Sequence, residues 1–171
     1  MLSTLWTEVP ATLTAAPELP AHVPAHWSTS LLVMLIALAV IVACVLMHYE
    51  GLTWLQKRLG HVHIGPKRLR VLFGIIGVLA MHAVEIVFFA LGYAMVHWMP
   101  DAGGVAGMAR PGLIDLSYFS AITYTTVGYG DLVPFGALRF LAAVESLSGF
   151  VLVSWSASFT YLVMERFWRT S

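Results

Sequence analysis

The chain has 171 residues, of which 59% are apolar and only 11% are charged. This composition excludes an ordinary water-soluble domain and is typical of a protein whose solvent is mostly lipid. Nine Lys and Arg balance nine Asp and Glu, and they form no basic stripe of the kind that grips nucleic acid. The single cysteine, Cys44, excludes a disulfide framework or a cysteine zinc site within one chain.

Residues 1–30 combine repeated prolines with Ala, Thr and His and contain no Lys or Arg. Such a composition cannot bury a core, so we expect a disordered extracytoplasmic tail. His22 and His26 are interpreted as solvated side chains rather than metal ligands. A secretory signal peptide is rejected because the stretch before the first apolar run is too long and lacks basic residues.

Three apolar segments have the length of a transmembrane helix, which is about 20 residues. They are residues 31–49, 71–98 and 137–164. The first follows Ser28, Thr29 and Ser30, any of which can serve as its N-cap. The sequence therefore predicts an all-α membrane protein with three spans.

The basic residues orient these spans. Five of the nine Lys and Arg lie in the linker 50–70, which is therefore expected on the cytoplasmic side. The N-terminus and the connection 99–136 are then outside, and the short tail 165–171 is cytoplasmic. Small size and the lack of regulatory domains favour the inner membrane of a bacterium.

The outer connection is too apolar for a plain loop. Its run IDLSYFSAITYT has helical length but cannot span, which predicts a short re-entrant helix at 115–125 capped by Asp115. The segment Thr125-Thr126-Val127-Gly128-Tyr129-Gly130-Asp131 continues it.

This segment resembles the signature of potassium channels, in which four TVGYG loops form a selectivity filter of backbone carbonyls. The resemblance covers residues 71–164 and is to the small two-transmembrane pore-domain family. It implies an outer helix at 71–98, a pore helix at 115–125, a filter at 126–131 and an inner helix at 137–164. The helix at 31–49 is additional to that pattern.

The resemblance also implies the roles of individual residues. K⁺ is expected at Thr126, Val127, Gly128 and Tyr129, and the ion-binding segment runs on to Gly130. Thr125 and Asp131 are expected to support the filter.

The chemistry of the segment agrees with this role. A dehydrated cation needs several oxygens at once, and a backbone can aim consecutive carbonyls at one axis only if some residues leave the right-handed regions. Gly128 and Gly130 permit this, while the Thr126 hydroxyl can add an oxygen at the inner end. One strand cannot surround an ion, so a homotetramer with the pore on its axis is expected.

Two acidic residues lie within the spans, where an ionisable group needs a partner or a proton. For Glu85 the partner is either His82 or Arg139. Glu145 is expected to support the filter by accepting from Tyr or Thr hydroxyls of the pore helix, although a neutral carboxyl in a watery crevice stays open.

Some bacterial potassium channels carry an acid in the pore helix where this chain has Ile122, so a clamp built on that acid is absent. The candidate polar supports are Tyr118, Thr123 and Tyr124. Gly149 is a candidate gating hinge in the inner helix, with close helix packing by a small residue as the alternative.

The predicted function is passive, selective conduction of K⁺, with the lipid bilayer and K⁺ as partners. No enzymatic step and no cofactor are expected, since Glu85 and His82 have no paired nucleophile. The alternatives are a less selective cation channel of the same architecture and a non-conducting membrane subunit that modulates another channel.

Overall fold

The computed structural model describes residues 27–61, 67–108 and 111–168. In chain order, its elements are α2 (Trp27–His61), α3 (Lys67–His97), β1 (Gly104–Ala106), α4 (Leu113–Tyr124), β2 (Val133–Phe135) and α5 (Leu138–Trp168). The helices α2, α3 and α5 are each long and apolar enough to cross a membrane. The predicted all-α membrane fold is confirmed, with a small two-stranded sheet added to it.

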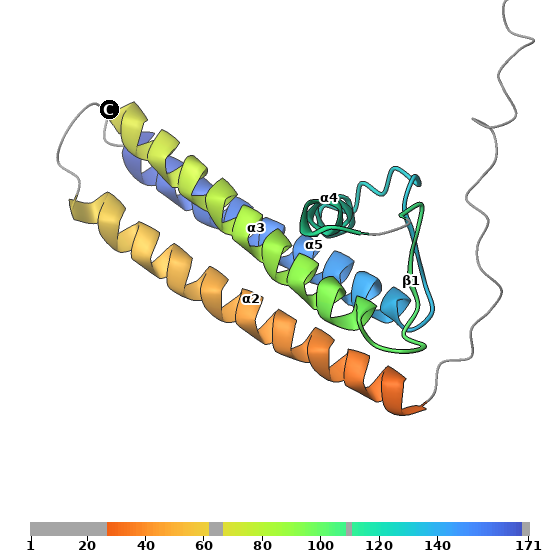
Figure 1. The fold of residues 1–171 in the computed structure, drawn as a ribbon. Coiled ribbons are helices and arrows are strands. Elements are labelled where there is room, and N and C mark those ends of the chain that lie inside the picture. Colours follow the sequence, from red (N-terminus) through yellow and green to blue (C-terminus); the bar gives the residue numbers. More distant parts are fainter. Residues whose placement is uncertain (1–26, 62–66, 109–110, 169–171) are drawn as a thin grey trace, which may run out of the picture.

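The three long helices lie side by side, with α2 and α5 running in one direction and α3 in the other (Figure 1). The short helix α4 packs against α3 and α5 in the half of the bundle where α2 begins. One end of the molecule therefore holds the start of α2, the end of α3 and the start of α5. The opposite end holds the connection from α2 to α3 and the end of α5.

The connection between the first two helices is shorter than the predicted linker 50–70. Helix α2 continues to His61 because Leu52, Leu55 and Leu59 recur at helical spacing and are buried against α3 and α5. Burial of these leucines stabilises the helix beyond the end of the uncharged run. Helix α3 begins at Lys67, since Lys and Arg are good helix formers.

The other helix ends also differ from the prediction. Helix α2 begins at Trp27, so Ser28, Thr29 and Ser30 lie in its first turn rather than before it. Helix α5 extends to Trp168 and takes in part of the predicted tail 165–171. The rest of that tail and most of the predicted N-terminal tail, with His22 and His26, lie outside the described residues.

The main apolar core joins α2, α3, α4 and α5 in the half of the bundle that holds α4. Phe89 of α3, Phe119 of α4 and Leu141 of α5 are among its fully or almost fully buried members. Ile122 belongs to this core and is 6% exposed. The position where some bacterial channels carry an acid is therefore an apolar packing site here.

The strands β1 and β2 pair antiparallel, with Gly104 opposite Phe135 and Ala106 opposite Val133. This pairing joins the chain just before the pore helix to the chain just after the filter segment. A β-carbon on Gly103 would lie 2.1 Å from the carbonyl oxygen of Phe135, and Gly103 has φ +91°. Only glycine allows the two segments to approach this closely.

Candidate ion-conduction site

The pore helix α4 places the filter. Its N-cap is Gly112, and the carboxylate of Asp115 accepts a hydrogen bond from the Gly112 amide at 2.9 Å. Asp115 therefore caps the helix from its third position rather than from the N-cap itself. Leu116 and Phe119 are buried and fix the helix against its neighbours.

The filter backbone has a left-handed conformation at every second residue. Thr126 has φ 59°, Gly128 φ 49° and Gly130 φ 84°. Glycine reaches this region without a steric penalty, whereas for Thr126 the conformation costs roughly 1–3 kcal/mol. When left-handed residues alternate with residues of other conformations, successive carbonyl groups point to the same side of the chain. A row of carbonyl ligands requires this arrangement.

Backbone hydrogen bonds tie this segment to the pore helix. The Gly128 amide donates to the carbonyl of Ile122 at 3.0 Å, and the Thr126 amide donates to the carbonyl of Thr123, also at 3.0 Å. The Ser146 hydroxyl of α5 donates to the same Thr123 carbonyl at 3.1 Å. The inner end of the filter is thus held by both the pore helix and the inner helix.

The two threonines at the start of the filter differ in their hydroxyl contacts. Thr125 Oγ1 donates to the Ala121 carbonyl at 2.7 Å, within the pore helix. Thr126 Oγ1 donates to the Thr125 carbonyl at 2.7 Å, which leaves its lone pairs free for a cation. Thr125 therefore closes the helix end, while Thr126 can offer an oxygen ligand.

The outer end of the filter has a separate support. Tyr118 of α4 donates to the carboxylate of Asp131 at 3.0 Å. This hydrogen bond, with the nearby negative charge, raises the pKa of the Tyr118 phenol and keeps it a donor. Both residues were candidate supports, and the structure brings them together.

The filter is uncovered in a single chain. Every residue from 125 to 131 is exposed, including Val127 at 53% and Tyr129 at 72%. Two large apolar side chains in such a position lack the packing that would fix them. A single chain therefore leaves the filter segment uncovered.

Glu145 lies behind the pore helix and is fully buried. It accepts hydrogen bonds from the hydroxyls of Ser120 on α4 and Tyr93 on α3. The expected hydroxyl donors were Tyr and Thr of the pore helix, but the pore-helix donor is a serine and the tyrosine comes from the outer helix. Ser120 also contacts the Ile86 carbonyl at 2.8 Å, so three helices meet at this point.

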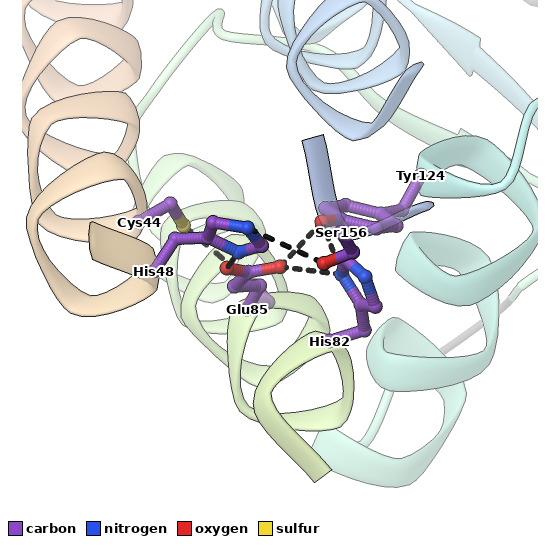
Figure 2. A network of polar contacts seen from close by, with 6 residues as sticks. All are labelled: Cys44, His48, His82, Glu85, Tyr124 and Ser156. Atoms are coloured by element: carbon purple, nitrogen blue, oxygen red, sulfur yellow. Dashed lines mark hydrogen bonds and ion pairs between the residues drawn. The ribbon is translucent and has the colours of Figure 1, made fainter. Parts of the chain in front are cut away.

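Glu85 is also fully buried, and side chains from four helices gather around it (Figure 2). His48 Nδ1 lies 2.7 Å from Glu85 Oε1, and His82 Nδ1 lies 2.8 Å from Glu85 Oε2. The Tyr124 hydroxyl donates to Oε2. Of the two partners left open, His82 is present in this network and Arg139 is not.

His48 was not singled out by the sequence. It lies on α2, is fully buried, and its Nε2 is 3.3 Å from Ser156 Oγ of α5. The position of His48 along α2 could have identified it. His48 precedes the end of α2 by nearly as many residues as His82 follows the start of α3. In two antiparallel helices joined by a short loop, such residues lie level with one another.

Gly149 packs directly against the pore helix. A β-carbon there would lie 2.0 Å from the carbonyl oxygen of Tyr124. Helix α5 runs without interruption through this point. The geometry is that of close packing by a small residue, which was the alternative to a hinge.

The family model for ion channels matches residues 78–166, which is more than half of the chain. The two-pore potassium channel 1 of Arabidopsis thaliana is 50% identical over 50 residues, covering 29% of this chain and 14% of that protein. Protein LctB of Geobacillus stearothermophilus is 35% identical over 72 residues, covering 36% of this chain and 54% of that protein.

The inward rectifier potassium channel Kirbac3.1 of Paramagnetospirillum magnetotacticum is 36% identical over 83 residues, covering 47% of this chain and 26% of that protein. The chain thus spans about half or less of the length of these relatives. No solved structure matches the chain significantly. With its re-entrant pore helix, its additional N-terminal helix and the family match across the pore domain, the chain belongs to the ion channel family, as a small pore-domain protein of the potassium-channel type.

Proposed function

We propose that this chain is one subunit of a homotetrameric channel that conducts K⁺ selectively and passively. The observation that carries the proposal is the left-handed backbone at Thr126, Gly128 and Gly130. It supports a row of carbonyl ligands at residues 126–129, with the Thr126 hydroxyl at the inner end. The negative end of the pore-helix dipole, at Tyr124, adds a favourable potential for a cation.

The surfaces that a single chain exposes support the homotetramer. The filter is exposed along its whole length, and α5 also exposes large apolar side chains, such as Leu147 and Phe150, each at 66%. Fourfold symmetry around the filter gives both surfaces a partner and places four strands around the ion. The names of two relatives, a two-pore potassium channel and an inward rectifier potassium channel, favour K⁺ as the ion.

We further propose that the filter end of the bundle faces outside, in the inner membrane of a bacterium. The clustering of Lys and Arg in the sequence between the first two apolar runs supports this orientation. The additional helix α2 braces the pore domain through the buried contact of His48 with Glu85.

Purified protein in liposomes tests the proposal. With a K⁺ gradient, the membrane potential should follow the Nernst slope for K⁺ and should ignore Na⁺. A potential that follows both ions indicates a less selective cation channel, and an absence of any ion flux indicates a non-conducting subunit. Native mass spectrometry of the detergent-solubilised protein should give four chains per particle.

A further inference from the structure

The side chains around Glu85 have the composition of a metal site. One ligand atom each from His48, His82 and Glu85 lies within 4.8 Å of the other two. Imidazole nitrogen and carboxylate oxygen are the usual protein ligands of Zn²⁺, and a set of two histidines and one glutamate is a known combination for it. The cluster meets the pore helix at Tyr124, the last residue of α4, and uses no residue of the filter.

We propose that His48, His82 and Glu85 bind one divalent transition-metal ion of the Zn²⁺ class per chain. Both histidines present the same atom, Nδ1, to the two oxygens of a single carboxylate, at 2.7 and 2.8 Å. Contacts this short between an imidazole nitrogen and a carboxylate need a proton between them. A cation at the centre of the cluster takes the place of these protons.

The surroundings of the cluster fit a ligating role. The other ring nitrogen of His48 faces Ser156 Oγ at 3.3 Å, and a hydrogen bond from the second ring nitrogen fixes the orientation of a metal-bound histidine. The hydroxyl oxygen of Tyr124 lies 2.9 Å from His82 Nδ1. The Tyr124 hydroxyl donates to Glu85 Oε2 and orients this ligand, and Zn²⁺ held by three protein ligands takes water as its fourth.

The cluster also borders a cavity. His82 is 13% exposed at its side chain, while His48 and Glu85 are fully buried. His82 and Ser156 line a cavity of about 410 Å³ between α3 and α5, together with Val78, Val153 and Tyr161. One ligand, His82, therefore borders a cavity that does not involve α2.

The test uses the full-length protein in detergent, freed of metal with a chelator, and Co²⁺ as the probe. Four-coordinate Co²⁺ gives intense visible bands, and Zn²⁺ should displace it because Zn²⁺ binds the same ligands more tightly. We expect one Co²⁺ per chain. His82→Gln and Glu85→Gln should each weaken binding by at least about 10–100-fold, the range known for loss of even an outer-sphere partner.

Two further variants separate ligand loss from misfolding. His82→Cys keeps a metal ligand and should restore binding, with a new near-ultraviolet band from charge transfer between sulfur and Co²⁺. His97→Gln also removes a histidine, at the exposed end of α3, and should bind as the wild type does. Absence of the visible bands in the wild type, or bands unchanged in His82→Gln and Glu85→Gln, would overturn the proposal.

Discussion

Gly149 of the inner helix lies so close to Tyr124 that a β-carbon would be 2.0 Å from the Tyr124 carbonyl oxygen. Tyr124 is the last residue of the pore helix, and the filter begins two residues later, at Thr126. The spacing between the inner helix and the filter is therefore set at a point where only a hydrogen atom fits.

Gly149→Ala should lower the stability of the protein. The methyl group meets backbone rather than a flexible side chain, and overpacking of this kind typically costs about 1–3 kcal/mol. The measurement is thermal unfolding in detergent. Gly74→Ala is the control, because its β-carbon would lie 3.5 Å from the nearest atom, Leu59 Cδ1. Unchanged unfolding of Gly149→Ala with altered channel opening would favour the hinge instead.

Gly128→Ala and Gly130→Ala should each abolish K⁺ conduction and leave a folded protein. A β-carbon at either position meets nothing within 4 Å in one chain, so the cost comes from the left-handed backbone at φ 49° and 84°. Gly60→Ala is a matched control, since it also meets nothing within 4 Å but lies in a helix. Normal K⁺ current from both filter variants would refute the filter assignment.

Glu145→Gln should make the filter easier to collapse. The substitution keeps the size of the side chain, but the amide NH₂ cannot accept from the second of the two hydroxyls, Ser120 and Tyr93, and a lost hydrogen bond costs roughly 1 kcal/mol. We expect faster loss of current at low external K⁺, with selectivity retained because the carbonyl ligands are unchanged.

Ser120→Ala should act in the same direction as Glu145→Gln, because it removes the pore-helix donor. Ser117→Ala is the control, since its hydroxyl donates to the Leu113 carbonyl of its own helix at 2.8 Å. Inactivation that is the same in all of these variants and in the wild type, at low and high K⁺, would contradict a supporting role for Glu145.

Thr126→Cys should weaken block by internal Ba²⁺, because sulfur replaces a hard oxygen ligand at the inner end of the filter. Thr125→Cys is the neighbouring control, since its hydroxyl is bound to the Ala121 carbonyl and does not face the ion in the proposed pore. Equal Ba²⁺ block in the wild type and Thr126→Cys would exclude the hydroxyl as a ligand.

The sequence predicted the three spans and the re-entrant helix because apolar run length reports directly on membrane crossing. It misplaced the end of α2, since the leucine spacing at Leu52, Leu55 and Leu59 continues past the first charged residues and its burial depends on α3 and α5. The length of an apolar run alone therefore does not predict where α2 ends.

The candidate site could also be predicted only in part. The filter motif is contiguous, so it could be read from residues 125–131. His82 is three positions from Glu85 and was a predicted partner, but other partners are distant in sequence: His48 is 37 positions from Glu85, and Tyr93 is 52 from Glu145. No local pattern pairs such residues, and only the packing of the helices brings them together.

The pairing of β1 with β2 makes the pore helix and filter a closed loop within each chain. The ends of this loop are held by ladder hydrogen bonds, and by the Leu138 amide donating to the Ala102 carbonyl at 3.1 Å. The entropy of closing the loop is thus lost during folding of the single chain. Association of chains then joins surfaces that are already ordered, and this preorganisation favours assembly.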